Sequence, residues 1–365
     1  MATYTVDWDG TSTLTREKVI PRIKDQFFKK NVLMYRIRPK AEMYSGGAFI
    51  RQPLSFSAEG GGGAWFAGTD KFDIRVRNPF TSATFQSKNF ELPIVITQDE
   101  EDAVDGPESF TTLLAAKMKI AERTIMDSIG GPNGIYNNGT NPKAITGLQA
   151  SLPDSLTTGT VNTWGGAYGG ISQASGANAF WNHQIDSTAY ITGSGGATNY
   201  IQAKNMAPWD TMISQQALAS GKYCSMILCN WGVFNELSQI VNSKTTFFRP
   251  QQDTELAKLG YLNYVYRNIT IVVDEQVPRG VPYGLGAKFE KVYFIDESAL
   301  HLWIHTARNF AFEGWRKPVD QALRVAYLWF RGEMSFDERR SSGVHCGTVN
   351  GTTQVGAGID TSLTS

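Results

Sequence analysis

The sequence has little cysteine, histidine or charge. Its 365 residues include 3 cysteines and 4 histidines, and only 19% are charged. Cys224, Cys229 and Cys346 are too few for a disulfide framework in a chain of this length, so we expect synthesis in a reducing cytosol. The 34 basic and 34 acidic residues leave no formal net charge. This balance argues against a generally basic nucleic-acid coat protein and against a polyanionic tail.

Long apolar runs are also missing. No stretch reaches the roughly 18 uninterrupted apolar residues that a membrane span needs. The first ten residues carry acids and no apolar core, so neither a membrane segment nor a signal peptide is predicted. Glycine (36 residues) and tryptophan (9 residues) are abundant in a chain that is 41% hydrophobic. We expect a globular chain of about two domains, or one large domain with insertions, with a weakly charged surface.

The charges that are present fall in blocks. Residues 16–40 hold nine basic and two acidic residues, a net charge of +7, and carry a short helical pattern. Residues 89–108 hold seven acidic residues and no basic one. The two blocks are candidate complementary interface surfaces, although a solvated helix face accounts for the basic block equally well. The candidate interface residues in these blocks are Arg16, Lys18, Arg22, Lys24, Asp99, Glu100, Glu101 and Asp102.

An extended hairpin is predicted between about 43 and 97. Apolar residues recur at every second position in 72–76 and in 90–96, which is the period of a strand. The four glycines at 60–63 fit the tip of the hairpin, and they lack the Gly-Lys-Ser/Thr ending of a phosphate loop. A two-stranded ribbon is only marginally stable alone, so it needs a partner surface. Three further candidate interface residues lie on it: Trp65, Arg75 and Arg77.

The rest of the chain divides into five segments. A capping-box-like start, apolar residues at helical spacing and a Gly-Gly end predict a helix over 105–129. The weakly charged, Gly-rich segment 131–203 would have to be ordered by neighbours, with its aromatic residues as anchors. From 208 an α/β unit is predicted, then strand-like patterns at 311–336 and a Gly/Thr/Ser tail over 341–365. Within the α/β unit we expect helices at 209–219 and 231–242 and strands at 225–228, 262–273, 291–296 and 300–304.

No catalytic, cofactor-binding or metal-binding set emerges. His301 and His305 lie in a strand-like segment, where residues four apart are about 13 Å from each other, too far to share a metal ion. The acids at 99–102 are more simply a solvated helix entry than a catalytic carboxylate pair. A Gly-rich α/β hydrolase would need convergent acid or Ser/His groups, and these are not found. A carbohydrate-binding or adhesion module, suggested by the tryptophans, would be expected to carry an export signal.

Several segments together resemble the major capsid proteins of tailed bacteriophages, the Hong Kong 97 fold family. They are Trp164-Gly-Gly-Ala-Tyr-Gly-Gly-Ile-Ser172 followed by Ala179-Phe-Trp181, Ile269-Thr-Ile-Val-Val-Asp-Glu-Gln-Val-Pro278, Phe310-Ala-Phe-Glu-Gly-Trp-Arg-Lys-Pro-Val-Asp-Gln-Ala322, and Ala326-Tyr-Leu-Trp-Phe-Arg-Gly-Glu333. The order and spacing of the predicted parts match the family over nearly the whole chain. The resemblance implies an α+β fold of the Hong Kong 97 type. Its parts would be an N-terminal arm (1–42), an extended hairpin loop (43–92), a peripheral domain (93–205 and 311–345) with a spine helix (106–129), an α/β axial domain (206–310) and a C-terminal tail (346–365).

The same resemblance implies a function. The chain would be a structural protein of the virion, not an enzyme, assembled in the host cytoplasm. Its copies would form pentamers and hexamers of an icosahedral head around double-stranded DNA, without sequence-specific contacts, without a cofactor and without a membrane. Scaffolding, portal and decoration proteins would be separate partners. An encapsulin-like or gene-transfer-agent shell protein is the nearest alternative.

Overall fold

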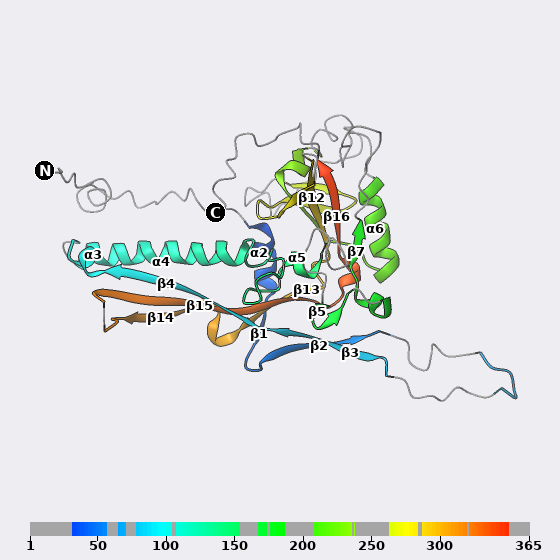
Figure 1. The fold of residues 1–365 in the computed structure, drawn as a ribbon, viewed down its shortest axis with the longest axis horizontal. Helices are drawn as coiled ribbons and strands as arrows, with labels where there is room; N and C mark the ends of the chain where they lie inside the picture. The colour runs from blue at the N-terminus through cyan, green and yellow to red at the C-terminus, as the bar shows by residue number, and fades with distance from the viewer. Residues whose placement is uncertain are drawn as a thin grey trace.

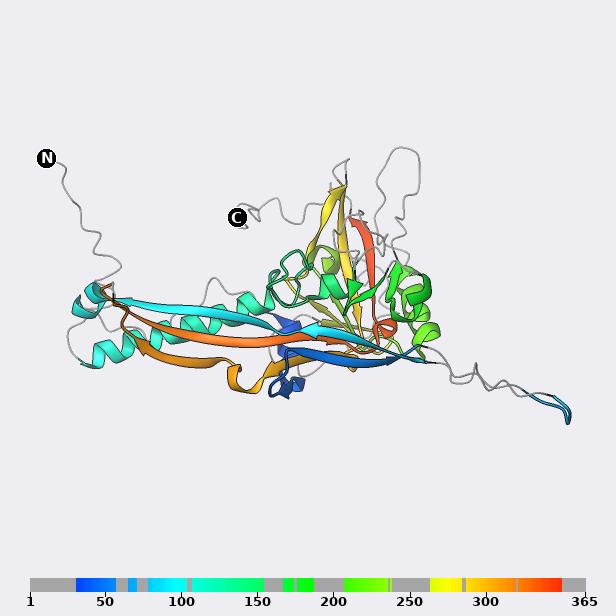
Figure 2. The ribbon, with the colours of Figure 1, turned by 60° about the horizontal axis from the view of Figure 1, so that its bottom comes forward.

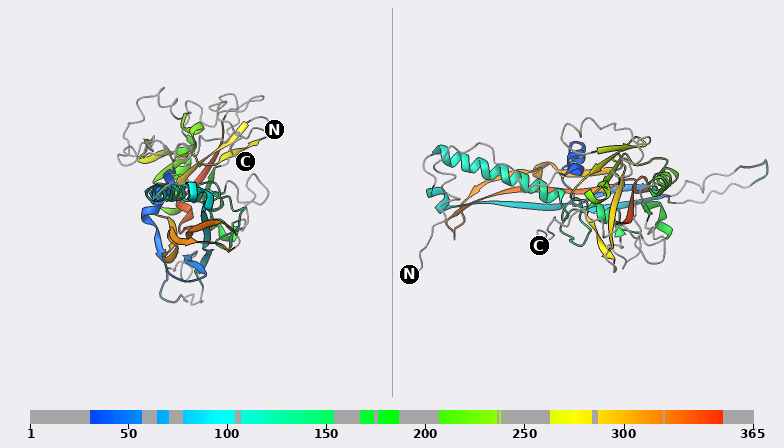
Figure 3. Two further views of the ribbon diagram at one scale, coloured as in Figure 1. Left: turned by 90° about the vertical axis from the view of Figure 1, so that its left-hand side faces the viewer. Right: turned by 90° about the horizontal axis from the view of Figure 1, so that it is seen from above.

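The computed structural model of the chain forms two sheets of unlike shape (Figures 1 and 2). A long five-stranded sheet, accompanied by one long helix, extends to one side, and a seven-stranded sheet forms the body beside its other end. A two-stranded ribbon leaves the body in the opposite direction to the long helix (Figure 3, right). The residues described are 31–56, 65–70, 78–103, 107–153, 167–173, 176–186, 207–235, 237, 263–283, 287–319 and 321–349.

The long sheet is organised around one strand, β15 (Leu323–Phe336). It pairs antiparallel with β4 (Lys88–Thr97) over ten positions, from Leu323 opposite Thr97 to Gly332 opposite Lys88. The remaining strands are β1 (Glu42–Tyr44), β13 (Leu300–His305) and β14 (Ala311–Arg316). β13 and β14 pair antiparallel with β15, while β1 pairs parallel with β13.

Helix α4 (Pro107–Gly130) runs along this sheet beside β4 (Figures 1 and 2). Its spacing of apolar residues brings Ile125 and Ile129 into the main core. The helix predicted over 105–129 is therefore confirmed from Pro107 onward, as is the strand pattern of 90–96. The helix ends at Gly130, whose carbonyl accepts a hydrogen bond from the Asn31 side-chain amide.

The seven-stranded sheet has the strand order β7-β16-β12-β8-β10-β9, with β11 paired to β12. Its strands are β7 (Gln184–Asp186), β8 (Met226–Cys229), β9 (Asn263–Tyr266), β10 (Ile269–Val273), β11 (Arg279–Tyr283), β12 (Ala287–Ile295) and β16 (Gly343–Val349). All four residues of β8 are buried, as expected for a strand covered on both faces. Helix α6 (Ala207–Ser220) packs on it through Trp209 and Met212, which share a core cluster with β8, β10 and β12.

Shorter elements connect the sheets. They are α2 (Val32–Ile37), η1 (Arg38–Lys40), β2 (Phe49–Ser55), β3 (Phe80–Gln86), α3 (Gln98–Ala103), α5 (Leu148–Ser151), β5 (Ala167–Tyr168), β6 (Ile171–Ser172), η3 (Gly176–Trp181), η4 (Thr306–Arg308) and η5 (Arg339–Ser341). Within the described residues, no helix is both long enough and apolar enough to cross a bilayer.

Asp274 joins three parts of the chain. This carboxylate, at the end of β10, is almost completely buried and accepts hydrogen bonds from the Tyr136 hydroxyl (2.8 Å) and the Gln276 backbone N–H (2.9 Å). It also accepts the Leu33 N–H at the start of α2 (3.4 Å). Asn31 caps the same helix, accepting from the Met34 N–H at 2.7 Å. The joint therefore fixes α2 and the segment after α4 against the seven-stranded sheet.

The structure corrects several boundaries drawn from the sequence. The tail expected from 346 is wrong for residues 346–349, because β16 pairs with β12 along its whole length. Residues 300–305, assigned to the α/β unit, belong to the long sheet, and 184–186, assigned to the peripheral domain, pair with β16. The strand expected over 262–273 is a tight hairpin, with positive φ at Arg267 and Asn268 as a two-residue turn requires.

Other expectations are confirmed or fall outside the described residues. The helix expected at 209–219 lies within α6, and the expected strands at 225–228 and 291–296 correspond to β8 and β12. Residues 231–235 and 237 are helical, and the remainder of the helix expected to 242 is outside the described residues. The same holds for the Gly-rich tip at 60–63, the strand pattern at 72–76 and the basic block as far as residue 30.

Candidate functional site: an assembly surface

The ribbon β2–β3 exposes an aromatic side chain at each of its ends. Its two strands pair antiparallel from Phe49 opposite Gln86 to Ser55 opposite Phe80, and β2 alternates exposed and half-buried positions throughout. Phe49 and Phe80 are 59% and 65% exposed. These two rings lie at opposite ends of the ribbon, where Phe49 is opposite Gln86 and Phe80 is opposite Ser55, and the exposed residues between them are mostly polar. They are two separate apolar sites on an element that is only marginally stable alone.

The root of the ribbon is firmly docked. Ala83 is completely buried, and the Phe85 ring packs against Tyr168 at 5.1 Å between centroids. The Thr84 N–H donates to the Gly169 carbonyl at 2.9 Å. Gly169 has a φ of +61°, and a Cβ there would lie 2.7 Å from the Ala83 Cβ, so only glycine fits at this contact. The ribbon is thus held at its base and leaves the body from a fixed point.

The short described segment 65–70, which begins with Trp65, lies well beyond the ends of β2 and β3 (Figure 1). The segment is turned by a hydrogen bond from the Asp70 N–H to the Ala67 carbonyl and by one from the Ala67 N–H to the Asp70 carboxylate, both 2.8 Å. Trp65 is fully exposed and Phe66 is two-thirds exposed. Large aromatic side chains in water are the residues whose burial contributes most to an interface.

The four acids of helix α3 differ in the contacts that they make within the subunit. Thr97 and Glu100 form a capping box, with the Glu100 N–H donating to Thr97 Oγ1 and the Thr97 N–H donating to Glu100 Oε2. Glu100 also pairs with Lys117 at 2.5 Å, and this hydrogen bond lowers the pKa of the Glu100 carboxyl. Glu101 pairs with Arg324 at 2.6 Å. Two of the four predicted interface acids are therefore engaged within the subunit.

Asp99 and Asp102 remain turned to solvent. Both are exposed, and Asp102 accepts one hydrogen bond from the Gln98 side chain at 3.2 Å. Neither forms an ion pair with another residue of the part of the chain that is described. They are the acids of α3 best placed to meet a basic partner.

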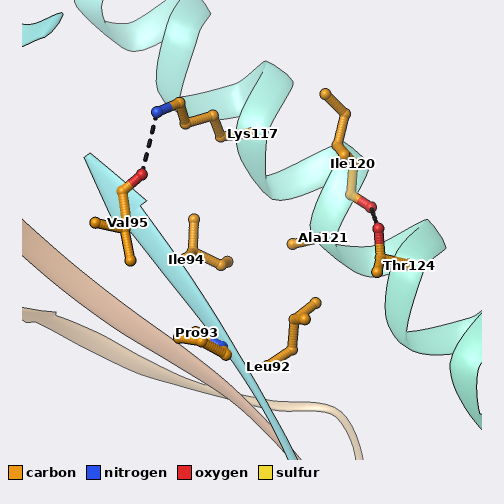
Figure 4. A pocket seen from close by; sticks show the side chains of 8 residues that line it. All are labelled: Leu92, Pro93, Ile94, Val95, Lys117, Ile120, Ala121 and Thr124. Atoms are coloured by element: carbon orange, nitrogen blue, oxygen red, sulfur yellow. Dashed lines mark hydrogen bonds between the residues drawn. The ribbon is translucent and has the colours of Figure 1, made fainter. Parts of the chain in front are cut away.

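An apolar groove lies between α4 and β4 (Figure 4). Its volume is about 230 Å³, and the Lys117 ammonium closes one end by donating to the Val95 carbonyl at 3.1 Å. Val95 and Ile120 on its walls are 41% and 42% exposed. The lining residues are Leu92, Pro93, Ile94, Val95, Lys117, Ile120, Ala121 and Thr124. Most of its lining is apolar, and its polar side chains are Lys117 and Thr124, of which Thr124 donates to the Ile120 carbonyl at 2.9 Å, so the groove offers a packing surface.

Arg339 is a buried cation that the sequence analysis missed. It is 1% exposed and donates to the Trp181 carbonyl at 2.9 Å, to the Ser151 carbonyl and to the Gln173 side chain at 3.2 Å. Its guanidinium lies 4.5 Å from the centroid of the Tyr168 ring. Burial lowers its pKa to about 10. Arg339 therefore ties the described parts of the Gly-rich segment to the turn between β15 and β16.

His183 completes this cluster as a neutral ring. Burial and the nearby Arg339 hold its pKa well below the usual value. Its Nε2 lies 2.6 Å from the Pro153 carbonyl and its Nδ1 lies 3.1 Å from an Arg339 nitrogen, so Nε2 carries the proton and Nδ1 accepts. Tyr168 and Trp181, two of the predicted anchors, are buried here, and Trp164 is outside the described residues. The arrangement is structural, since both ring nitrogens are occupied.

Glu333 is a second buried charge, in the middle of β15. It is completely buried and accepts from the backbone N–H groups of Thr146 (2.7 Å) and Met334 (3.2 Å) through one oxygen. Its other oxygen has no partner among the described residues. Burial raises the pKa of this carboxyl from 4.5 to about 7. Among the described residues the carboxyl is held by Thr146 and Met334, so it anchors the segment 144–146 against β15.

The thiols and histidines do not assemble into a metal site in the described parts of the chain. Cys224 and Cys229 are buried, and burial raises the pKa of Cys224 to about 12. His301 and His305 lie on β13, as the alternating pattern indicates, and His301 contacts two carboxylates that belong to other elements. Of the predicted interface residues, Arg16, Lys18, Arg22, Lys24, Arg75 and Arg77 are outside the described residues and stay predictions.

Proteins similar to this chain are found among solved structures. No family model and no curated protein sequence matches the chain. The capsid asymmetric unit of cyanophage A-1(L) is similar to it at a TM-score of 0.60 and 13% identity, covering 92% of this chain and 96% of that one. The capsid of a native GTA particle gives a TM-score of 0.55 at 9% identity, covering 96% and 100%. The capsid of cyanophage Pam1 gives 0.52 at 12% identity, covering 97% and 100%. The chain has the Hong Kong 97-type capsid fold that its sequence resembled.

Proposed function

We propose that the chain is the structural subunit of an icosahedral shell, a major capsid protein that assembles through pentamers and hexamers around double-stranded DNA in a virion. The observation that carries the proposal is the likeness to capsid chains over almost the full length of both partners. A fold alone does not determine function. The exposed ribbon and the divided acids of α3 add the surfaces that such a function requires.

The ribbon is the element that most needs a second copy of the chain. Its root is fixed at Ala83 and Gly169, whereas Trp65 is fully exposed far from any core of the described subunit. Covering a tryptophan removes a large apolar area from water, at about 25 cal/mol for each Å² buried. A neighbouring subunit would supply the missing surface, and the ribbon would join adjacent copies.

Charge would orient the contact. Asp99 and Asp102 are the exposed acids of α3, and the basic block over 16–40 is the largest positive segment of the sequence. We propose that these two surfaces meet between subunits, because complementary charge favours one register and speeds association. Trp65 and these acids are then interface residues, together with the predicted basic ones.

The remaining partners follow from the same proposal. Packaged DNA would be retained by confinement, without contacts that read bases. Scaffolding, portal and decoration proteins would be separate chains, and assembly would take place in the host cytoplasm. The absence of enzymatic activity is part of the proposal, supported by the structural roles of Arg339, His183 and Glu333.

Electron microscopy and sedimentation of the purified full-length protein test the proposal. Hollow shells or rings of five and six subunits are expected, and a stable monomer or dimer at every concentration would overturn it. Trp65→Ser should abolish assembly, while Trp65→Phe, which keeps an aromatic ring, should retain part of it. Both variants should unfold at the same denaturant concentration as the wild type, because Trp65 is outside the core.

A second candidate is a shell of the gene-transfer-agent kind. The likeness to the native GTA capsid, at a TM-score of 0.55, favours it. Both kinds of shell would show the same subunit contacts, so the contents of purified particles separate them. Sequencing of nuclease-protected DNA would give one repeated genome for a virus and random host fragments for a transfer agent. A shell that enclosed a protein cargo and no DNA would instead support the encapsulin-like alternative.

A further inference from the structure

His301 lies between two carboxylates from different parts of the chain. Its Nδ1 is 2.6 Å from Glu42 Oε1, and its Nε2 is 3.2 Å from Asp337 Oδ2. An ionised carboxylate only accepts hydrogen bonds, and a neutral imidazole has a single N–H to donate. Both contacts are hydrogen bonds only when the ring carries two protons. The geometry therefore selects the imidazolium at this position.

The three residues meet at the root of the ribbon. Glu42 begins β1, which leads through a short connection into β2, and Asp337 follows the last residue of β15. Gln52 of β2 reaches the same corner: with its amide nitrogen facing the Phe336 carbonyl (3.1 Å), its oxygen accepts from the Asp337 N–H (3.2 Å). His301 thus links the strand that enters the ribbon to the strand end on which the ribbon rests.

β1 has few other attachments. It is three residues long, and among the described strands it pairs with β13 alone. Beyond that ladder, Thr306 Oγ1 donates to the Tyr44 carbonyl at 3.0 Å, and the Tyr44 ring meets His305 edge-on at 5.2 Å. The segment before β1 is fixed by the Lys40–Glu297 pair at 2.9 Å. A strand this short depends strongly on each side-chain contact that holds it.

We propose that His301 is a proton-dependent clasp for the ribbon: as an imidazolium it ties β1 to the end of β15, and loss of one proton releases one of the two carboxylates and loosens β1 and the start of β2.

The direction of the pH dependence follows from the surroundings of the ring. The charged groups that face it are Asp337 from the end of β15 and Glu42 from β1, and β2 contributes the uncharged Gln52. The hydrogen bond to Asp337 raises the pKa of His301 above its usual value; burial opposes the shift, and Glu42 adds to it. A raised folded pKa means that the clasp is fully formed below the ordinary histidine pKa of about 6.5 and opens as the pH rises through the raised value.

Hydrogen exchange of the unassembled full-length chain tests the clasp, and its outcome does not depend on whether shells form. Amide exchange rates in 42–44 and 49–55 would be measured from pH 5.5 to 8.5. Protection is the intrinsic exchange rate at each pH divided by the measured rate. In the wild type, protection should fall several-fold as the pH rises through the raised pKa. In His301→Gln it should be low and independent of pH, because both N–H groups of the amide are on one nitrogen, whereas the two carboxylates contact different nitrogens of the histidine ring.

Two conservative variants keep the test decisive if His301→Gln destabilises the fold. Asp337→Asn removes the carboxylate that raises the pKa most, so the loss of protection should move to lower pH. Glu338→Gln is the matched control: it removes the neighbouring carboxylate, which pairs with Lys222 at 2.9 Å, and it should leave the profile unchanged. Protection that does not vary with pH in the wild type, or a His301→Gln profile that follows the wild type, would overturn the proposal.

Discussion

The seven-stranded sheet and the ribbon β2–β3 differ in how much of their surface the fold of the chain covers. All four residues of β8 are buried, and Phe294 on β12 is completely inaccessible. On the ribbon no residue of β2 is fully buried, and Phe80 on β3 is 65% exposed. The sheet is completed when the chain folds, because its own helices cover it. The ribbon is covered on one face, where Ala83 and Phe85 lie in the main core and Ile50 and Leu54 pack against it, and its other face is left open to a neighbouring molecule.

The largest expected effect lies in the compact part of the molecule. Arg339→Met should lower the free energy of unfolding by about 3 kcal/mol, because it leaves the carbonyls of Ser151 and Trp181 buried without a donor. Denaturant unfolding measures the loss. Arg340→Met, one residue along and less buried, is the control and should change stability by less than about 0.5 kcal/mol. Equal losses of stability at the two positions would contradict the view that the buried contacts of Arg339 stabilise the compact part of the molecule more than its surface residues do.

The buried Glu333 should make the compact part sensitive to pH. Its folded pKa of about 7 lies above the ordinary 4.5, so the folded state holds the proton more tightly than the unfolded chain does. Stability should therefore fall as the pH rises from about 4.5 to about 7, by on the order of 3 kcal/mol. Glu333→Gln replaces the titrating carboxyl by a neutral amide, so the variant should gain stability relative to the wild type as the pH rises over this range. Unfolding at pH 5 and pH 8 measures the difference. A constant difference between variant and wild type would show that the carboxyl titrates normally.

Substitution of the exposed acids of α3 should change assembly and leave the stability of the subunit unchanged. Asp99→Lys with Asp102→Lys should prevent or strongly impair assembly, because the pair would repel the basic block. The unfolding free energy of the unassembled chain should stay within about 0.5 kcal/mol, since both side chains are exposed. Sedimentation and denaturant unfolding of the same preparation measure the two effects. Normal shells from this variant would contradict the proposal that α3 lies in the interface between subunits.

The smallest expected effect concerns the acids that are paired within the subunit. Glu100→Gln breaks the ion pair with Lys117, and exposed pairs of this kind contribute about 0.2–1 kcal/mol. Because the pKa of Glu100 is lowered, its contribution is present above about pH 4.5 and is lost as the pH falls through the lowered value. The difference in unfolding free energy between Glu100→Gln and the wild type should therefore be measurable at pH 7 and shrink towards zero at pH 3. Assembly should be unaffected, in contrast to the Asp99 and Asp102 variant.

Much of the fold was predictable because local sequence patterns carry it. The apolar spacing of 110–129 and the alternation of 90–96 identify α4 and β4, since period and burial agree there. β16 was missed because its two glycines and the Gly/Thr-rich residues after it resemble a loop, and pairing with β12 makes it a strand. The assignment of β13 to the α/β unit was wrong for a related reason: sequence neighbourhood does not determine which sheet a strand joins.

The sequence proposes interface residues by type, and the structure shows which of those described are engaged within the subunit. Block charge indicated α3, yet only the structure separates Glu100 and Glu101, which are paired internally, from Asp99 and Asp102. Trp65 was identified from its place beside a Gly-rich tip, and the structure leaves it fully exposed. Arg339 gave no signal, because a pair of arginines near the end of a chain usually indicates a solvated surface. Its burial depends on contacts 156–188 residues away in the sequence.

The measurement that tests the central claim most directly is oxidative footprinting of Trp65 and Phe66 in the free subunit and in assembled particles. Both side chains are accessible in the subunit, so both should react rapidly there. If the ribbon is completed by a neighbouring copy, their labelling should fall at least several-fold on assembly, while Leu218 on α6, 87% exposed, serves as an internal reference. Equal labelling of Trp65 in the two states would contradict the claim that another subunit covers the ribbon.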